Sequence, residues 1–527
     1  SRKRRHSRVE DRPRIVMDRS TSMAKLEAEV QGDLDWIVMK CLERDRTRRF
    51  GSASEFASDL ERYLQGVPVT ASPPSASDRL SKFVRRNKTL LVFISLIGLL
   101  VTAISAFAKN PIPVDSFNDS YIVDHLSLFF ICIFTISSAL AILLSVEYNE
   151  REGIRAGEYY ALVLFCTIGM ILLASYTDMI MIFLDIEISS ISLYVLTGIR
   201  RDNHRSNEAA LKYFLLGAFA TGFLLYGMTL VYGSTGHTNL FKIAEFVQNP
   251  AAQSNPLLLM GLVLLIIGFG FKVASVPFHM WAPDVYQGAP TPITAFMAVG
   301  PKAAAFAAFF RVFAETFPEM APSWEILLST IAVLSMFFGN LGAIMQTNIK
   351  RMLAFSSISH AGYILIAVIA KNSLGGSSLL FYMLAYAFTI FGLFGIIIIL
   401  GRKGEENLEI ENYTGLAYRH PILALSMTVF LLSLGGLPPF AGFIAKFYIF
   451  SAAIQQGLIT LVIFAVLNSV ISFYYYLKVV VFMYMKEPEV EFKISLTPLT
   501  LFVVFIGVTA TISLGIFPGS IIALASH

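Results

Sequence analysis

The chain has 527 residues, of which 55% are hydrophobic, 13% aromatic and only 15% charged. Soluble domains carry about 25% charged residues and the mean hydropathy here is +0.64, so the composition excludes an ordinary soluble protein and predicts an integral membrane protein. The net charge of +4 is unevenly spread, because residues 1–88 hold 20 Lys/Arg and 13 Asp/Glu whereas the rest holds 21 and 24. We therefore expect a charged segment, 1–88, followed by a membrane domain, 89–527.

No apolar stretch precedes residue 89, so no cleavable signal is expected. A membrane-spanning helix needs about 20 mostly apolar residues. Thirteen stretches meet this requirement, and the fold class is therefore predicted to be an all-α polytopic membrane protein. The candidate spans are 89–107, 121–145, 158–176, 178–198, 209–232, 256–280, 292–315, 325–346, 349–370, 377–400, 421–450, 457–484 and 496–520.

Lysine and arginine in the loops predict the orientation of these spans. RRNKT precedes the first span, which places residues 1–88 in the cytoplasm. Successive crossings then bring Arg151, Arg155, the cluster GIRRDNHR, Lys350–Arg351 and the loop beginning GRKGEEN to the same side. The opposite side receives loops with little positive charge, so the count of thirteen and the charge bias agree.

The order of spans predicts an internal repeat. Spans 158–315 form a group of five and spans 325–484 form a second group of five. An odd number of crossings repeated in tandem inverts the second unit relative to the first. The fourth helix of each group is interrupted by proline, at Pro277 in VASVPFH and at Pro438 and Pro439 in GGLPPFAG. Broken helices in corresponding positions of two halves indicate a transport site.

Five charged residues lie within the apolar spans, where a charge costs roughly 2.5–3.5 kcal/mol at the helix centre. They are Glu187, Lys212, Lys272, Lys302 and Lys446. One acid and four lysines on five helices favour a chain of proton-exchanging groups over a single cation site, since a metal site needs several converging carboxylates. Proline breaks free backbone carbonyls and admit water, and His360 and His279 are candidate relays between lysines.

Structural roles are the alternatives for these and neighbouring residues. Lys212 lies near a helix end, where its side chain can extend to the cytoplasmic surface. His360 and His279 can equally be hydrogen-bonded core residues. Asp185 is two residues from Glu187 and so points to another face of its helix, where it is expected to be a local ion-pair partner. Arg311 lies near an outer helix end and is expected to be an interfacial anchor.

Cofactor motifs are missing from the sequence. Cys41, Cys132 and Cys166 are scattered without CxxC spacing, which does not suit iron–sulfur clusters or structural zinc. No GxGxxG opens a βαβ unit and no GxxxxGK[ST] occurs. We therefore expect no metal, nucleotide or redox cofactor on this chain.

Several stretches resemble a known family. The antiporter-like membrane subunits of respiratory complex I are closely resembled by three stretches, GFGFKVASVPFHMWAPDVYQGAPTP, QTNIKRMLAFSSISHAGY and LSLGGLPPFAGFIAKFY. Similarity to the subunit N family of this complex is carried by three further stretches, EGIRAGEYYALVLF, SLYVLTGIRRDNHRSNEAALKYFLLGAFATGFLLYG and YYYLKVVVFMY. The resemblance as a whole covers about residues 89–525. The resemblance implies two inverted five-helix repeats, each with a half-channel. It also implies a location in the bacterial inner membrane among other complex I membrane subunits.

The same resemblance implies roles for individual residues. Glu187 looks like the family's essential glutamate of the fifth helix, and Lys212 like the lysine of the next helix. Lys272 and Lys446 match the lysines of the two broken helices, and Lys302 matches the central connecting lysine. Together they imply a proton path in the membrane plane, driven by quinone reduction elsewhere. NADH, FMN, iron–sulfur clusters and quinone then belong to partner subunits.

Two features depart from the family. The family has fourteen helices, the first starting outside, whereas thirteen are predicted here and residues 1–88 take the place of the first. Within them, GDLDWIVMKCLERDRTRRFGSASEFASDLERYLQGVPV resembles the end of a bacterial Ser/Thr protein kinase domain, with Arg49 similar to the arginine that closes the C-lobe. The catalytic kinase motifs are absent, so no kinase activity is expected. Family members also usually have a small residue at the position of Asp185.

The leading hypothesis is a proton-translocating subunit of NADH-quinone oxidoreductase. One alternative is an Mrp-type cation/proton antiporter subunit, which shares the broken helices and lysines. The other is a membrane-anchored signalling protein, although an anchor has no reason to retain five membrane charges. Nucleic-acid binding by SRKRRHSR is not expected, because a basic flank beside anionic lipid explains that run more simply.

Overall fold

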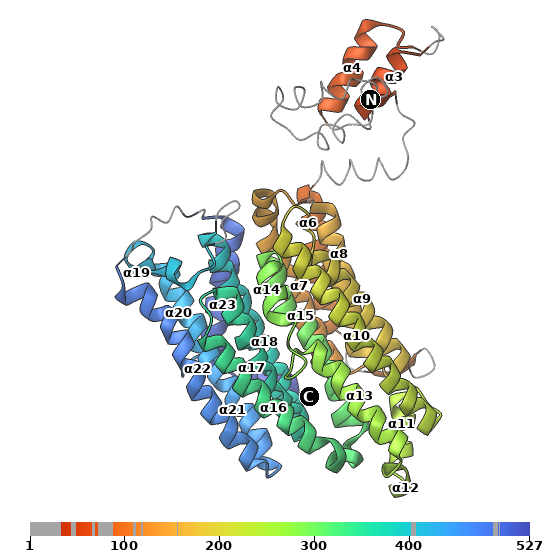
Figure 1. Cartoon of the computed structure of the whole chain (residues 1–527), viewed down its shortest axis with the longest axis vertical. Helices are drawn as coiled ribbons and strands as arrows, with labels where there is room; N and C mark the ends of the chain where they lie inside the picture. Colours follow the sequence, from red (N-terminus) through yellow and green to blue (C-terminus); the bar gives the residue numbers. More distant parts are fainter. Residues whose placement is uncertain are drawn as a thin grey trace. The chain divides into compact units, whose positions relative to one another are not determined.

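The computed structural model describes residues 33–43, 49–65, 69–71, 88–108, 112–116, 120–154, 156–401, 407–487, 494 and 496–526. The chain divides into two compact units, Ser1–Leu91 and Val92–His527 (Figure 1). The predicted basic run SRKRRHSR, and the predicted cytoplasmic markers Arg155 and Arg402–Lys403, lie outside the described residues.

The first unit contains two short helices, α3 (Asp33–Cys41) and α4 (Ala53–Leu64). Ser52 caps α4 by accepting a hydrogen bond from the backbone N–H of Glu55. Asp59 is buried and accepts hydrogen bonds from the backbone N–H groups of Thr70 and Ala71, at 2.7 and 2.9 Å. Arg49 is exposed and donates to the carbonyl oxygen of Glu43. These contacts fix the start of α4 and the segments that flank the two helices.

The second unit is a helical bundle with one β-hairpin, β1 (Ile112–Ser116) paired antiparallel with β2 (Tyr121–Val123). Its long helices are α6 (Lys88–Ala108), α7 (His125–Glu152), α8 (Ala156–Ser175), α9 (Met179–Thr197), α10 (His204–Thr235), α13 (Pro256–Lys272), α15 (Thr291–Phe310), α16 (Ala321–Ile344), α17 (Ile349–Ala370), α18 (Ser373–Leu400), α20 (Pro421–Gly435), α21 (Ala441–Gln455), α22 (Ile459–Met485) and α23 (Pro498–Ile516). Its short helices are α11 (Leu240–Val247), α12 (Pro250–Gln253), α14 (Ala282–Gly288), α19 (Leu416–Arg419), α24 (Gly519–Ser526), the π-helix Arg311–Thr316 and the 3-10 helices Pro318–Met320 and Ile410–Tyr413.

Among the described residues, ten helices are long and apolar enough to cross a membrane. Four shorter apolar helices accompany them, Leu90–Ala106, Pro256–Lys272, Pro421–Gly435 and Ala441–Gln455. The all-α polytopic fold is therefore confirmed, whereas the number of thirteen crossings and the inverted relation of the repeats stay predictions. The predicted spans 256–280 and 421–450 are interrupted, since α13 ends at Lys272 and α20 at Gly435.

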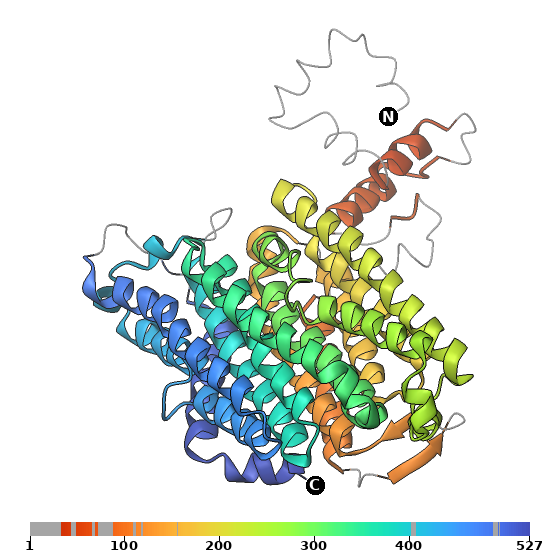
Figure 2. The ribbon, with the colours of Figure 1, turned by 60° about the horizontal axis from the view of Figure 1, so that its bottom comes forward.

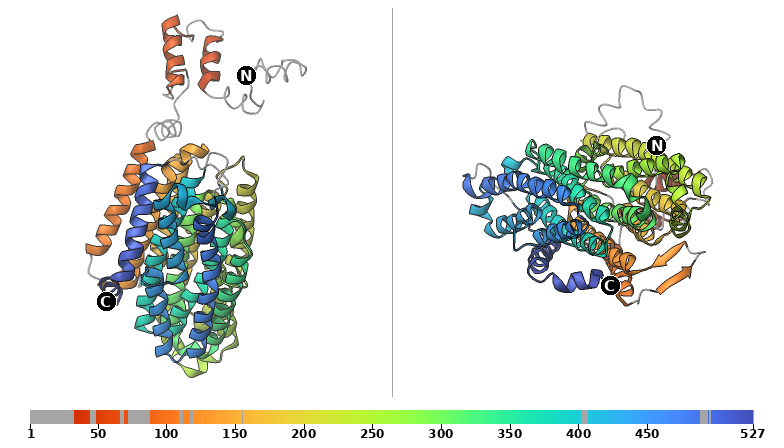
Figure 3. Two further views of the ribbon diagram at one scale, coloured as in Figure 1. Left: turned by 90° about the vertical axis from the view of Figure 1, so that its left-hand side faces the viewer. Right: turned by 90° about the horizontal axis from the view of Figure 1, so that it is seen from below.

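Three helices form the centre of the bundle. Nearly all residues of α15, α17 and α18 are buried, whereas α10, α22 and α23 leave broad apolar faces exposed. Figure 1 shows α8, α9, α10 and α13 on one side of this centre and α20, α21 and α22 on the other, and the same separation of yellow from blue helices is seen in Figure 2 and in the right-hand view of Figure 3. Exposed Phe219, Phe464 and Phe505 on the outer helices suit contact with lipid.

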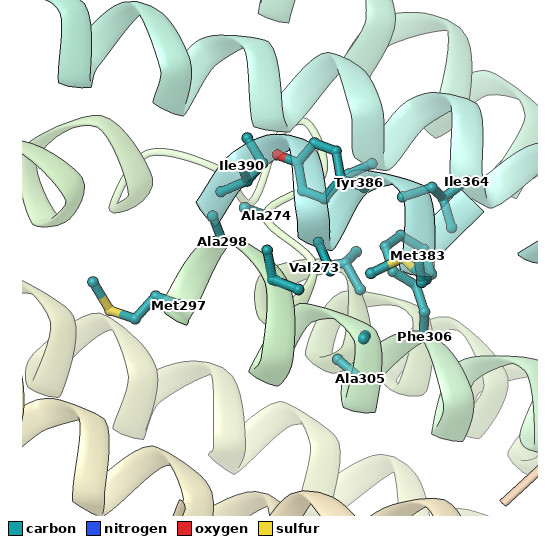
Figure 4. Close-up of a cluster of buried hydrophobic side chains, with 14 of the residues drawn as sticks. Val273, Ala274, Met297, Ala298, Ala305, Phe306, Ile364, Met383, Tyr386 and Ile390 are labelled. Carbon is teal, nitrogen blue, oxygen red and sulfur yellow. The ribbon is translucent and has the colours of Figure 1, made fainter. Parts of the chain in front are cut away.

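The break after α13 lies against this centre. Val273 and Ala274 pack against Ala298 of α15 and Tyr386 and Ile390 of α18 (Figure 4). The polar backbone atoms that the break frees find partners, because Val276 N–H donates to the hydroxyl of Ser335 on α16, at 2.9 Å, and the carbonyl of Phe271 accepts from the Trp281 indole, at 3.1 Å. The irregular backbone is thus buried in protein, the condition under which it is tolerated at membrane depth.

The second break is built in a similar way. Gly436 caps α20 in the left-handed region, at φ +90°, which a side chain would disfavour. Its N–H donates to the carbonyl of Leu432, and the N–H of Gly442 donates to the hydroxyl of Ser433 at 3.1 Å. Both breaks therefore replace lost helical hydrogen bonds with side-chain and turn partners.

Candidate functional site

Lys272 lies at the last residue of α13, directly before the first break. Its ammonium donates to the Ser190 hydroxyl at 2.8 Å and lies 3.9 Å from Oε1 of Glu187. The same carboxylate oxygen accepts a hydrogen bond from the Thr221 hydroxyl at 2.8 Å. Three helices, α9, α10 and α13, thus converge on one lysine–glutamate pair, whose side chains are 10% and 26% exposed.

Lys302 lies in the middle of α15 and is buried. Its ammonium donates to the carbonyl oxygen and the hydroxyl of Ser357 on α17, both at 2.9 Å. Both acceptors are neutral. Among the described residues no carboxylate pairs with this ammonium, and an unpaired ammonium is costly in a dry interior.

Lys446 lies one turn into α21, after the second break, and is buried. It donates to the carbonyl of Gly435, which the break leaves free, at 2.7 Å and to the Ser469 hydroxyl at 2.8 Å. Its ammonium also lies 4.7 Å from the centre of the Tyr363 ring. These partners are neutral as well, so Lys446 repeats the situation of Lys302.

His360 lies between these two lysines on α17. Ser357, His360 and Tyr363 follow one another at intervals of three residues, so they share a helix face. The imidazole is buried, with Nδ1 2.5 Å from the Tyr382 hydroxyl and Nε2 3.2 Å from that of Tyr476. This face of α17 therefore carries polar groups from the partner of Lys302 to the ring beside Lys446.

Lys212 lies apart from this buried line. Its side chain is 42% exposed and pairs with Glu208 at 2.7 Å and with Asp284 of α14 at 2.8 Å. Asp284 also accepts from Arg351 of α17 at 2.6 Å. This position agrees with the alternative in which Lys212 reaches the surface.

The remaining predicted residues have varied settings. Nδ1 of His279 is buried and has no hydrogen-bond partner among the described residues. Pro277, Pro438 and Pro439 all lie in the non-helical segments that interrupt the two broken helices. Asp185 is buried, and its Oδ2 likewise has no hydrogen-bond partner in the described part of the chain.

The expectation that Arg311 is an interfacial anchor is corrected. Its side chain is only 3% exposed and donates to Asp124 at 2.6 Å. It also donates to the carbonyl of Ala174 at 2.9 Å, at the end of α8. A buried guanidinium needs such partners, so Arg311 ties the ends of α7, α8 and α15 together.

The sequence interpretation missed the hydroxyl groups that bind the lysines. Ser190, Ser357 and Ser469 come from helices other than those of their lysines, and Thr221 binds Glu187 in the same way. A Ser or Thr within an apolar span is the available signal, but it is common on membrane helices. No group of three or more His, Cys, Asp or Glu side chains placed to hold a metal ion occurs among the described residues.

A multi-pass helical bundle with two broken helices and buried lysines beside them defines an antiporter-like membrane subunit. Residues 176–472 match the family described as NADH:quinone oxidoreductase/Mrp antiporter, transmembrane. NADH-quinone oxidoreductase subunit N of Trichlorobacter lovleyi is 49% identical over 443 residues, covering 84% of this chain and 91% of that protein. Subunit N 2 of Rhizobium meliloti is 42% identical, covering 85% and 93%.

Solved structures agree with these relatives. A chain of respiratory complex I from Thermus thermophilus has 35% identity and a TM-score of 0.70, covering 83% of this chain and 95% of that one. A chain of the Mrp complex from Dietzia sp. shares the fold, with a TM-score of 0.74 at 21% identity, covering 90% and 97%. The chain belongs to the NADH-quinone oxidoreductase subunit N family, and it is a multi-pass protein of the bacterial inner membrane. These comparisons give no support to the kinase resemblance expected for residues 1–88.

Proposed function

We propose that this chain is a non-redox membrane subunit of NADH-quinone oxidoreductase that moves protons across the membrane, coupled to quinone reduction in partner subunits. The observation that carries the proposal is the Glu187–Lys272 contact at the first broken helix, with Ser190 as a further partner of the ammonium. A lysine beside a carboxylate holds its proton, and loses it more readily when the two separate.

The rest of the path follows the buried amines. A proton released from Lys272 passes to Lys302, and from there along Ser357, His360 and Tyr363 of α17 to Lys446. Within the part of the chain that the structure describes, Lys302 and Lys446 donate hydrogen bonds to neutral oxygens, and Lys446 also faces an aromatic ring. Each is therefore easier to deprotonate than an ion-paired lysine, and water between them completes the hydrogen-bonded chain.

Lys212 serves this path from the cytoplasmic side. Together with Glu208 and Asp284 it forms a partly exposed ion cluster that exchanges protons with water. His279 lies beyond the first break, at Pro277, and is proposed as a second relay. Pro438 and Pro439 open the second break beside Lys446 in the same manner.

The remaining parts of the proposal concern partners and domains. The chain itself binds no redox cofactor, and NADH, FMN, iron–sulfur clusters and quinone reside on partner subunits. Its neighbours are other complex I membrane subunits and lipid. Residues 1–88 are a cytoplasmic segment without kinase activity, and residues 89–527 form the membrane domain, with repeats at about 158–315 and 325–484.

The test uses the assembled oxidoreductase in proteoliposomes. Lys272→Met is expected to abolish or strongly reduce proton uptake per NADH oxidised, while the complex still assembles. Lys242→Met is the matched control, because Lys242 is an exposed lysine of α11. Pumping at the unaltered level in Lys272→Met would disprove the proposal.

An Mrp-type cation/proton antiporter is the second candidate, favoured by the likeness in fold to the Mrp complex. It predicts Na⁺-dependent proton exchange in vesicles without NADH. Exchange that needs Na⁺ and continues in the absence of NADH and quinone would favour this function over the first.

A further inference from the structure

The hydroxyl of Tyr194 is a buried polar group that makes no hydrogen bond of ordinary geometry with the described residues, although the Ser190 side chain lies near it. The residue is only 8% exposed, on the helix α9 that carries Glu187. Buried hydroxyls are normally hydrogen-bonded, and leaving one unpaired costs about 1–3 kcal/mol. The hydrogen bonds of the structure therefore do not explain why this position carries a hydroxyl group.

Helix periodicity places Tyr194 on the face that forms the lysine–glutamate site. Glu187, Ser190 and Tyr194 are spaced at i, i+3 and i+7, so they follow one another along one face of α9. Ser190 accepts the hydrogen bond from Lys272, and Glu187 lies beside the same ammonium. Tyr194 is thus the next polar side chain on this face, one turn beyond Ser190.

The facing helix α10 leaves room for this hydroxyl. A Cβ atom on Gly217 would lie 2.8 Å from Cζ of Tyr194 and closer still to its hydroxyl oxygen, nearer than real Cβ atoms approach. Gly217 is one turn before Thr221, whose hydroxyl donates to Glu187. The Tyr194 hydroxyl therefore rests on the α10 backbone, about 6 Å along the helix axis from the residue that binds the glutamate.

Neighbouring rings fix this orientation. Tyr213 packs edge-on against the Tyr194 ring, with ring centres 4.8 Å apart at 90°. Tyr213 in turn stacks on Trp281 at 4.6 Å and 12°, and the Trp281 indole donates to the carbonyl of Phe271, next to Lys272. The position of the Tyr194 ring is thus linked to the broken helix by direct contacts.

Tyr194 lies between the Lys212–Asp284 ion cluster and the Glu187–Lys272 pair. Lys212 and Thr221 are nine residues apart on α10, an axial distance of about 13.5 Å, which is too long for one proton transfer. Gly217, and with it the Tyr194 hydroxyl, lies near the middle of this interval. Tyr194 also lies three residues from the end of α9, the end predicted to be cytoplasmic.

We propose that Tyr194 is a further proton-relay residue, connecting the Lys212–Asp284 cluster with the Glu187–Lys272 pair. The inference rests on the proposed function and adds a residue to it. In the step, the Lys212 ammonium gives a proton to a water molecule, which passes one of its own to the phenol oxygen, while the phenol O–H proton passes through a further water to the Glu187 carboxylate. Lys212 then regains its proton from water at the cytoplasmic surface. Tyr194 ends as the neutral phenol it was, and one proton has moved inward.

Tyr194→Phe in the assembled oxidoreductase tests the proposal, since it removes one oxygen and keeps the ring. The rate of proton uptake into proteoliposomes is expected to fall at least about tenfold, a lower bound because a proton-transferring group typically contributes about 10²–10⁴-fold. The thermal midpoint is expected to stay or rise, because an unpaired hydroxyl is removed. Tyr226→Phe, an exposed tyrosine of α10, is the control. Unaltered pumping in Tyr194→Phe would overturn the inference.

A second pair of variants moves the hydroxyl without removing it. Gly217→Ala displaces Tyr194, whereas Gly222→Ala on the same helix meets nothing within 4 Å. Slower pumping in the first and not in the second supports the relay, and equal rates oppose it. Lys272→Met separates the two proposals. If it loses pumping while Tyr194→Phe keeps it, only the relay is refuted, and if Lys272→Met pumps normally, the proposed function fails.

Discussion

Gly442→Ala is expected to disable the second broken helix by displacing Lys446. Gly442 is the second residue of α21, and its backbone lies against the end of α20. A Cβ atom there would stand 2.7 Å from the carbonyl carbon of Ser433 and closer still to the oxygen, whereas real Cβ atoms keep at least 3.0 Å from such atoms. The obstacle is backbone, so a side-chain rotation cannot relieve it.

The size of the effect follows from these distances. The carbon contact alone requires a shift of at least 0.3 Å, and the nearer oxygen requires more. Lys446 lies one turn further along α21 and donates to the Gly435 carbonyl at 2.7 Å, so moving α21 away stretches this bond. A lost hydrogen bond to a charged group costs about 1.5–3 kcal/mol, and overpacking costs about 1–3 kcal/mol. We expect a total destabilisation of about 2.5–6 kcal/mol.

The assay compares Gly442→Ala with Gly222→Ala, in which a new methyl group meets open space. Thermal unfolding of the purified complex and proton uptake per NADH in proteoliposomes are measured for both. The first variant is expected to lose stability and pumping, and the second neither. If the two variants matched each other in both measurements, the argument from the close approach of α20 and α21 would be refuted.

Three further predictions concern other contacts. Ser190→Ala removes a hydrogen-bond acceptor of Lys272, so the complex should lose about 1–3 kcal/mol and pump more slowly, and an unaltered pumping rate would contradict this. Lys302→Met replaces a buried amine by an apolar side chain, so the thermal midpoint should not fall while proton uptake is lost; a variant that still pumps would contradict the role of Lys302. Burial raises the pKa of Asp124, but the Arg311 guanidinium and the Ser127 hydrogen bonds outweigh burial and hold this pKa below the usual 3.8. The ionised Asp124 therefore stabilises the fold fully above about pH 4, and this stabilisation is lost as the pH falls through the lowered pKa. Asp124→Asn should therefore destabilise the protein at pH 7 and make little difference in strong acid, and an equal effect at both pH values in thermal unfolding would contradict the assignment.

Much of the helical architecture was predictable, because insertion depends on local composition. The predicted span 349–370 coincides with α17, Ile349–Ala370, and 178–198 differs from α9 by one residue at each end. Asn348 and Asp178 cap these helices, so the chain itself marks where each begins. The predicted span 421–450 was less accurate, since hydropathy does not separate α20 from α21 across Gly436.

The partners of the charged residues were not predictable in the same way. Lys272, Lys302 and Lys446 stood out because a charge in an apolar span is costly wherever the helix packs. Their partners follow from helix packing, which no local pattern describes. Lys212 is an example. Its place in an apolar span suggested a buried member of the proton path, whereas its partner in the structure is Asp284 of α14, 72 residues away in the sequence.

The sequence by itself determined that this protein crosses the membrane many times, where two of its helices break, and which charges lie within its apolar spans. Each of these properties depends on residues that are neighbours in the sequence, through the transfer free energies of an apolar stretch or the effect of proline on its own helix. Only the tertiary structure decided that Lys272 meets Ser190 and Glu187, that Lys302 meets Ser357, and that the Tyr194 hydroxyl lies against Gly217. Those contacts join residues on different helices, and their distances depend on how the whole bundle packs.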